Sequence, residues 1–235
     1  MNPISNKSHP PARYIALIPA AGVGARMGGQ IPKQYLTIAG QPILRYTAQA
    51  FLAAPEIAHT YVVVSLDDAY VDEALAGLQD VSILRCGGAT RRESVSNGLK
   101  ALASSCDAQD WILVHDAARP GLTTHLLTKL IQEVGDHAVG GLLALPVVDT
   151  VKRVNQGKVD TISRDGLWLA QTPQMFRHGV LSKALLAAEE VTDESSAIEL
   201  SGRIPLLVEG HACNLKVTLP SDLALVELYL SGNVI

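Results

Sequence analysis

The residues best suited to chemistry lie in one glycine-rich segment near the start of the chain, residues 19–28 (Pro-Ala-Ala-Gly-Val-Gly-Ala-Arg-Met-Gly). Gly22 and Gly24 carry no side chain, so the backbone can approach a phosphate closely there and turn its N–H groups toward it. Arg26 within the segment and Lys33 shortly after it add two cations. Glycines alone would suit a plain turn, but the two cations favour a loop that binds phosphate.

Three familiar nucleotide-binding motifs do not fit this segment. A P-loop requires Gly-Lys followed by Ser or Thr, which the segment lacks. A dinucleotide-binding fingerprint requires a third glycine, but Met27 stands at that position. The other signature elements of a protein kinase are missing from the chain. The segment therefore predicts another class of phosphate site, in which the small Ala20 and Ala21 leave room for a ligand.

The elements that must position this loop follow an alternating pattern. Short apolar runs typical of buried strands alternate with segments of helical spacing, which predicts an α/β fold with a mostly parallel sheet and helices on both faces. Ligands of such sheets bind beyond the carboxyl ends of the strands, so the loops after Ala20, Arg85 and His115 are expected on one rim. The predicted strands span residues 14–20, 60–65, 81–85, 111–115, 139–145 and 205–208, and the predicted helices span 41–54, 67–78, 90–103, 126–134, 178–189, 195–201 and 220–230.

The alternation breaks after residue 146. Two strand-like runs, residues 147–154 and 158–163, flank the turn-like sequence Asn-Gln-Gly at 155–157, which predicts a β-hairpin inserted between elements of the main sheet. An isolated hairpin is barely stable in water. This β-arm, about residues 147–170, must therefore pack on something, and a second subunit is an obvious candidate.

Length and composition bound the remaining possibilities. The 235 residues suit a single domain over residues 14–235, preceded by a flexible polar leader of residues 1–13 without a hydrophobic signal core. A net charge of −4 argues against general binding of nucleic acid, and no apolar run is long enough to span a membrane. The three cysteines match no zinc pattern, and their odd number disfavours a disulfide framework, so a reduced cytoplasmic protein of bacterial type is expected.

Further motifs follow the glycine-rich loop. They are Pro-Lys-Gln-Tyr-Leu at 32–36, Gly-Gly-Ala-Thr-Arg-Arg-Glu-Ser-Val at 87–95, Val-His-Asp-Ala-Ala-Arg-Pro at 114–120, a segment at 146–153 that contains Asp-Thr, Arg-Asp-Gly-Leu-Trp at 164–168, Gln-Thr-Pro-Gln at 171–174, Thr-Asp-Glu at 192–194 and Asn-Leu-Lys-Val-Thr at 214–218. In these motifs and their order, over about residues 14–230, the chain resembles the 2-C-methyl-D-erythritol 4-phosphate cytidylyltransferase family. The resemblance implies a Rossmann-like nucleotidyltransferase fold with an inserted β-arm.

The resemblance also implies a reaction and its partners. The expected reaction transfers CMP from CTP to 2-C-methyl-D-erythritol 4-phosphate and releases pyrophosphate, a step in the non-mevalonate synthesis of isoprenoid precursors. Arg26, Lys33 and Lys216 correspond to the family's catalytic cations, which offset the charge that develops on the α-phosphate and the pyrophosphate. Mg²⁺, or another divalent cation, is expected on the triphosphate, and the β-arm is expected to join a homodimer.

Two loops are expected, by the same resemblance, to hold the nucleotide. Gly88, Ala89 and Ser94 correspond to the residues that read cytosine, although Ser94 fits equally well as an ordinary helix residue. Several members of the family carry an acidic residue where Ala89 stands, so a side-chain contact is missing here while a backbone contact is retained. The residues assigned to the nucleotide are Pro19, Ala20, Ala21, Gly22, Gly24, Gly88, Ala89, Ser94 and Ala117.

The acceptor site is assigned by resemblance to Asp116, Arg119, Thr150 and Arg164. Asp116 would accept hydrogen bonds from the polyol hydroxyls or help to hold the metal; the alternative is a buried pair with Arg119 that only fixes a turn. Thr150 and Arg164, on the β-arm, would bind the acceptor's phosphate in the neighbouring subunit's site, since a guanidinium suits phosphate. His115 is expected to be a packed neighbour, because a phosphate already ionised at neutral pH requires no general base.

Three alternatives compete with this interpretation. A ribitol 5-phosphate cytidylyltransferase would share the loops and the chemistry and would differ around Asp116, Thr150 and Arg164. A nucleotide-binding module without catalytic activity could lose the cations, so their retention argues against it. A nicotinamide-dependent oxidoreductase is disfavoured by the missing third glycine.

Overall fold

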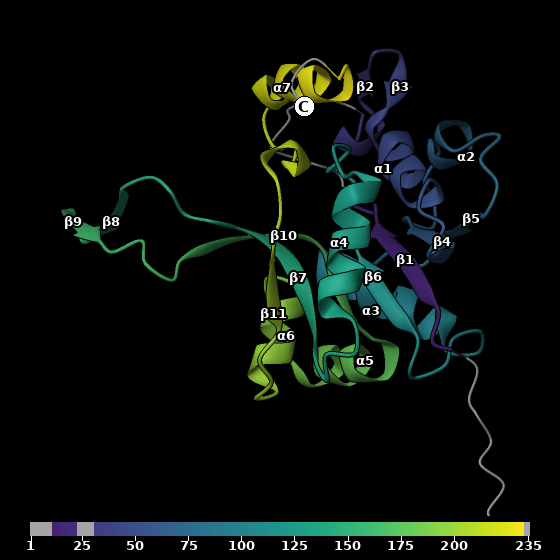
Figure 1. Cartoon of the computed structure of the whole chain (residues 1–235). Helices are drawn as coiled ribbons and strands as arrows, with labels where there is room; N and C mark the ends of the chain where they lie inside the picture. Colours follow the sequence, from purple (N-terminus) through teal and green to yellow (C-terminus); the bar gives the residue numbers. More distant parts are fainter. Residues whose placement is uncertain (1–10, 23–30, 233–235) are drawn as a thin grey trace, which may run out of the picture.

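A seven-stranded sheet forms the centre of the molecule (Figure 1). The computed structural model describes residues 11–22 and 31–232, so most of the predicted leader lies outside the described residues. The strands of the sheet are β1 (Tyr14–Pro19), β4 (Ile57–Val63), β5 (Val81–Leu84), β6 (Trp111–Val114), β7 (Gly140–Pro146), β10 (Trp168–Arg177) and β11 (Leu206–Glu209). They lie in the order β11-β7-β10-β6-β1-β4-β5, and all neighbours are parallel except β10, which runs antiparallel to both β7 and β6.

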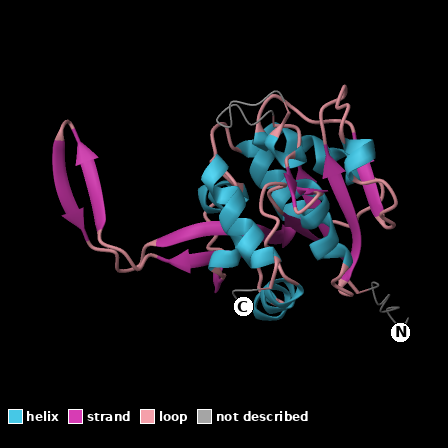
Figure 2. Ribbon diagram, turned by 90° about the horizontal axis from the view of Figure 1, so that it is seen from above, coloured by secondary structure: helices cyan, strands magenta, loops and turns pink. Residues whose placement is uncertain are grey.

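Helices cover both faces of this sheet (Figures 1 and 2). They are α1 (Ile43–Leu52), α2 (Val71–Ala74), α3 (Arg91–Leu102), α4 (Thr124–Val134), α5 (His178–Ala187), α6 (Glu194–Leu200) and α7 (Pro220–Leu230). Successive strand residues point to opposite faces: Ala16 and Ile18 of β1 pack with α1 and α4, whereas Ile15 and Leu17 pack with α3, α5 and α6. Within the described ranges, none of the helices has the length and apolar character needed to cross a membrane.

The predicted α/β fold is confirmed, but the second predicted helix is wrong in length. The helix expected over residues 67–78 is the single turn α2. The Asp68 carboxylate accepts hydrogen bonds from the backbone N–H groups of Tyr70 and Val71, both at 3.0 Å, so the helix starts only after it. Gly77, with φ of +77°, then turns the chain away.

Strand β10 was not predicted from the sequence. Its central residues 171–174 (Gln-Thr-Pro-Gln) interrupt the apolar alternation, and its pairing with β7 shifts register between Ala170 and Gln174. The strand nevertheless lies between β7 and β6, with residues 171–176 buried. Because its first residues continue from the β-arm, β10 connects the arm directly to the middle of the sheet.

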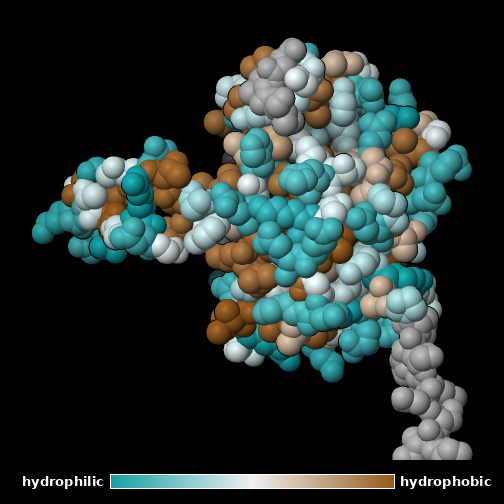
Figure 3. All heavy atoms as spheres, viewed as in Figure 1, coloured by the Kyte–Doolittle hydropathy of each residue, from teal (hydrophilic) through white to brown (hydrophobic). Residues whose placement is uncertain are grey.

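The predicted hairpin is confirmed as β8 (Val151–Asn155) paired antiparallel with β9 (Lys158–Ile162). The β-arm projects from the body of the molecule in both ribbon views (Figures 1 and 2). Apolar side chains on the arm are exposed (Figure 3), and Val148, Val154 and Val159 are 65–71% exposed. An apolar surface of this kind on a projecting segment suits contact with another protein chain.

Candidate functional site

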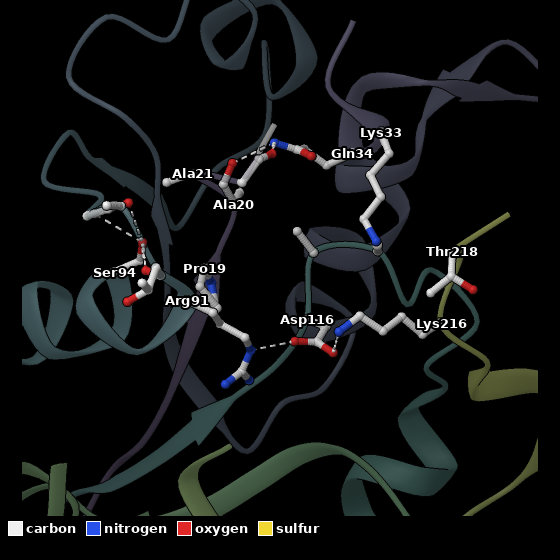
Figure 4. Close-up of a pocket in the computed structure, with 16 residues that line it drawn as sticks. Pro19, Ala20, Ala21, Lys33, Gln34, Arg91, Ser94, Asp116, Lys216 and Thr218 are labelled. Atoms are coloured by element: carbon white, nitrogen blue, oxygen red, sulfur yellow. Dashed lines mark hydrogen bonds and ion pairs between the residues drawn. The ribbon is translucent and has the colours of Figure 1, made fainter. Parts of the chain in front are cut away.

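A cavity of about 340 Å³ opens at the carboxyl ends of the central strands (Figure 4). Its walls come from the loops after β1, β5 and β6, as expected for an α/β sheet, and from residues 216–218. The predicted site residues that line it are Pro19, Ala20, Ala21, Gly22, Lys33, Gly88, Ala89, Ser94, Asp116, Ala117 and Lys216. The structure thus brings together residues that lie almost 200 positions apart in the sequence.

The first wall is the start of the glycine-rich loop. Gln34 braces it, because its side-chain amide donates hydrogen bonds to the carbonyls of Ala20 at 2.6 Å and Gly22 at 3.0 Å. The buried Gln34 was not predicted as a site residue, although it directly follows Lys33 in the sequence. The predicted residues Gly24 and Arg26 lie outside the described residues.

The second wall is the loop between β5 and α3. Thr90 caps α3 in a reciprocal capping box with Glu93, which fixes how the chain enters the helix. The Ser94 hydroxyl donates to the Thr90 carbonyl at 2.9 Å and accepts from the Gly88 N–H at 3.1 Å. Ser94 therefore braces the loop from within α3, and it also lines the cavity.

Gly87 is where these two walls touch. A Cβ atom on Gly87 would lie 2.3 Å from the Ala21 Cβ and 2.9 Å from the Val64 carbonyl group. We expect Gly87→Ala to push the walls apart and to weaken binding of CTP, the nucleotide that the sequence predicts, by about tenfold, which corresponds to the loss of one hydrogen bond. Adding Ala21→Gly should restore part of the affinity, measured by titration calorimetry. A Gly87→Ala variant that binds CTP normally would contradict this close approach.

Asp116 lies at the bottom of the cavity, and cations approach it from opposite sides (Figure 4). The Arg91 Nε donates to its Oδ1 at 2.8 Å, the Lys216 Nζ lies 2.9 Å from Oδ2, and the Arg119 Nε lies 3.5 Å from Oδ2. Burial would raise the pKa of Asp116, but Arg91 and Lys216 outweigh burial and hold that pKa far below its ordinary value. Asp116 is therefore an ionised hydrogen-bond acceptor at every pH at which the protein would work.

His115 is fully buried behind Asp116 and takes part in one hydrogen-bond chain. The Asp116 N–H donates to the Thr172 hydroxyl at 3.1 Å, and that hydroxyl lies 2.9 Å from the His115 Nδ1. The His115 Nε2 lies 3.2 Å from the Arg119 carbonyl. Because the Arg119 carbonyl can only accept, Nε2 carries a proton, and in the neutral ring Nδ1 accepts from the Thr172 hydroxyl. His115 thus fixes the turn that carries Asp116, as a packed neighbour would.

Burial lowers the pKa of His115 to about 4. In the unfolded chain a histidine takes up its proton near pH 6.5, so the unfolded state binds more protons between pH 6.5 and 4. The free energy of unfolding therefore carries the full contribution of neutral His115 above pH 6.5. It falls by about 3 kcal/mol as the pH drops to 4. We expect His115→Gln to flatten this slope in urea unfolding at pH 7 and pH 4.5, whereas the exposed His125→Gln should keep it. Parallel slopes for His115→Gln and the wild-type protein would contradict this account.

Lys33 and Lys216 come to the cavity from opposite ends of the chain. The Lys33 Nζ donates to the Val217 carbonyl at 2.9 Å, directly beside Lys216. The Val217 N–H in turn donates to the Ala118 carbonyl at 2.8 Å. The C-terminal segment is thereby tied to the loop after β6, and two cations face one cavity.

The other predicted acceptor residues do not line this cavity. Arg119 is buried beneath it, where its Nη1 donates to the Asn214 carbonyl at 2.7 Å. Thr150 and Arg164 are exposed on the β-arm, and the Arg164 guanidinium donates to the Val148 carbonyl. Within one chain the structure therefore separates the arm residues from the cavity.

Several lining residues were not predicted. The most informative is Arg91, the first residue of α3, which contacts Asp116 and also the buried Glu194 at the start of α6. Both residues belong to motifs noted in the sequence, but nothing in their local patterns indicates that residues 103 positions apart are partners. The lining residues without a predicted role are Gln34, Thr90, Arg91, Ala118 and Thr218.

Comparison with known proteins gives one consistent result. The family model described as 2-C-methyl-D-erythritol 4-phosphate cytidylyltransferase matches residues 14–232. Proteins of that name from Paraburkholderia phymatum and Chromobacterium violaceum are 51% and 52% identical, each over 93% of this chain and over 97% and 98% of their own lengths.

Solved structures agree with the sequence relatives. A crystal structure of 4-diphosphocytidyl-2C-methyl-D-erythritol synthase superposes with a TM-score of 0.84 at 42% identity, covering 93% of this chain and 99% of the other. The 2-C-methyl-D-erythritol 4-phosphate cytidylyltransferase of Thermus thermophilus gives a TM-score of 0.75 at 30% identity, covering 92% and 97%. With its loops, cavity and β-arm in the predicted order, the chain belongs to the 2-C-methyl-D-erythritol 4-phosphate cytidylyltransferase family.

Proposed function

We propose that the chain transfers CMP from CTP to the phosphate of 2-C-methyl-D-erythritol 4-phosphate and releases pyrophosphate. The observation that carries this proposal is a single cavity lined by two glycine-containing loops and by the cations Lys33 and Lys216. Such a cavity suits a nucleoside triphosphate, because the loops offer backbone N–H groups and the lysines offset phosphate charge. Membership of the family supports the choice of CTP and of this acceptor.

We assign the nucleotide to the side of the cavity that the two loops form. Residues 19–22, followed by Gly24 and Arg26, would contact the triphosphate, whereas Gly88, Ala89 and Ser94 would face the base. Ala89 has no polar side-chain atom, so recognition of cytosine at this position would rest on backbone groups. Ala117 would line the space between the base and the reacting phosphate.

The reaction forms a bond between an oxygen of the acceptor's phosphate and the α-phosphorus of CTP. The bond from that phosphorus to the bridging oxygen breaks, and its electron pair leaves with pyrophosphate. A phosphate monoester has its second pKa near 6, so the nucleophile is ionised at neutral pH and no side chain has to remove a proton. Arg26, Lys33 and Lys216 would act by positioning the phosphates and by offsetting the developing charge.

Mg²⁺ would enter as a complex with CTP. Among the described residues there is no group of three or more His, Cys, Asp and Glu side chains that could hold a metal ion. Asp116 is the one carboxylate among the described residues that line the cavity, and Arg91 and Lys216 already bond both of its oxygens. The triphosphate oxygens would therefore hold the ion, and Asp116 would serve the hydroxyls of the polyol.

The β-arm would complete the site of a second subunit. Thr150 and Arg164 are exposed on a segment that projects away from the body of their own chain. The exposed valines of the arm supply an apolar surface for a homodimer contact. In that dimer Arg164 would bind the acceptor's phosphate through two parallel N–H···O bonds.

The test is pyrophosphate release from CTP with Mg²⁺, with 2-C-methyl-D-erythritol 4-phosphate and ribitol 5-phosphate compared as acceptors. We expect release with the first acceptor alone. Release with ribitol 5-phosphate alone would keep the chemistry and replace the substrate. Binding of CTP without release in either case would identify a nucleotide-binding module and overturn the proposal.

A further inference from the structure

We infer that Glu194 is a positioning residue that, through Arg91, keeps Asp116 in place for the polyol acceptor. This inference rests on the proposed function and adds to it a residue that does not line the cavity. Glu194 is 1% exposed, at the first position of α6. Its two carboxylate oxygens accept hydrogen bonds from the Arg91 Nη1 at 2.7 Å and Nη2 at 2.9 Å.

The geometry leaves Arg91 one nitrogen for the cavity. With both terminal nitrogens on Glu194, the planar guanidinium presents Nε to the Asp116 Oδ1 at 2.8 Å. Burial would lower the pKa of Arg91, but Glu194 and then Asp116 outweigh burial and raise it, so the group is a permanent cation. Arg91 is thus fixed in one orientation rather than left to contact a phosphate in the cavity.

The backbone turn that carries Glu194 is held in place by two neighbouring side chains, Asp193 and Gln174. The Asp193 carboxylate caps α6 by accepting from the Ser196 N–H at 2.9 Å. Gln174 of β10 ties the same turn to the sheet, since its amide donates to the Asp193 Oδ2 at 2.8 Å and accepts from the Ser195 N–H at 2.7 Å. The start of α6 is therefore fixed to the sheet. Because Glu194 is part of that turn, its two hydrogen bonds hold Arg91 in place as well.

The Glu194–Arg91 contact matters because Lys216 is needed at two places. Its Nζ bonds the Asp116 Oδ2 at 2.9 Å, yet the proposed reaction also requires it at a phosphate. Whenever Lys216 turns to the phosphate, Asp116 keeps its orientation only if the Oδ1 side is held. Arg91, fixed by Glu194, holds that side, while Arg119 lies farther away at 3.5 Å from Oδ2.

A purely structural role is the competing explanation, and it is the weaker one. A buried ion pair contributes little net stability compared with apolar packing, so stability alone gives little reason to place Glu194 and Arg91 here. The chain also contains a matched case for comparison. Asp110, 2% exposed, accepts two side-chain hydrogen bonds from Arg13 and lies at the opposite end of β6 from Asp116.

The experiment compares Glu194→Gln with Asp110→Asn in steady-state kinetics and thermal unfolding. We expect both variants to lose stability, but only Glu194→Gln to lower kcat/KM for 2-C-methyl-D-erythritol 4-phosphate, by about tenfold, which corresponds to one charged hydrogen bond. KM for CTP should change little in both. Equal acceptor kcat/KM in Glu194→Gln and wild-type protein would overturn the inference.

Arg91→Lys provides a second route in case Glu194→Gln does not fold. Lysine keeps the charge but cannot bond Glu194 and Asp116 in one plane, so the same selective loss for the acceptor is expected. If both variants fold, their effects should not add in the double variant, because each substitution breaks the same chain of contacts from Glu194 through Arg91 to Asp116. Normal acceptor kinetics in Arg91→Lys, or fully additive losses, would contradict the inference. A wild-type protein that releases no pyrophosphate would instead defeat the proposed function itself.

Discussion

Lys33→Ala is expected to lower kcat for pyrophosphate release by about 100-fold or more, the loss typical when one group that stabilises a transition-state charge is removed. Lys33 lies in the cavity wall and is not part of the apolar core on either face of the sheet, so we expect the Lys33→Ala variant to fold. Charge grows on the leaving pyrophosphate as the bond breaks, and a cation at the cavity wall acts most strongly on that charge. CTP affinity should therefore fall much less than kcat.

The measurement is single-turnover pyrophosphate release at saturating CTP, with CTP affinity determined separately. Lys183→Ala provides the control, because Lys183 is exposed on α5 and does not line the cavity. Single-turnover kinetics keep chemistry apart from product release. If Lys33→Ala lost CTP affinity and turnover in equal proportion, Lys33 would be a binding residue and the catalytic assignment would be wrong.

Regular periodicity explains what the sequence made predictable. Strand β1 is a continuous apolar run, buried on both faces, and α4 carries apolar residues at helical spacing behind the Thr123 cap. The loop positions follow from parallel topology, which places Gly22, Gly88 and Asp116 on one rim without knowledge of their contacts. Elements with a repeating residue pattern, and loop positions that follow from topology, could therefore be predicted from the sequence alone.

The features that were missed depend on contacts between distant residues. Strand β10 is defined by its neighbours β6 and β7, since its own residues 171–174 break the strand pattern. Arg91 has an ordinary sequence context for a first helical turn, and only the fold places Glu194 against it. The short α2 begins late because the Asp68 carboxylate accepts from the Tyr70 and Val71 N–H groups, and it ends early because the chain turns at Gly77; neither effect shows in the helical spacing of the residues.

The β-arm gives the second large expected effect. Arg164→Ala should raise KM for 2-C-methyl-D-erythritol 4-phosphate by about tenfold or more, because a charge-assisted guanidinium–phosphate contact is lost. CTP affinity should be unchanged, since the proposed contact of Arg164 in the partner's site is with the acceptor's phosphate and not with CTP. Arg153→Ala, exposed on the same arm, is the matched control for loss of arm charge. Equal losses for acceptor and CTP would count against the role of the arm.

Mixing the two impaired variants Lys33→Ala and Arg164→Ala, assayed at an acceptor concentration far below KM, tests whether each arm completes the site of its own subunit or that of its partner. A Lys33→Ala subunit keeps its Arg164, and an Arg164→Ala subunit keeps its Lys33. If arms exchange between subunits, each mixed dimer holds one complete site, and a random mixture should recover about a quarter of wild-type activity. If each arm served its own subunit, every site would lack one residue and the mixture would show no more than the average activity of the two variants. Recovery therefore requires both the dimer and the exchanged arm. We expect recovery because Arg164 is exposed on the arm, which projects from the body of its chain, and does not line the cavity that contains its own Lys33.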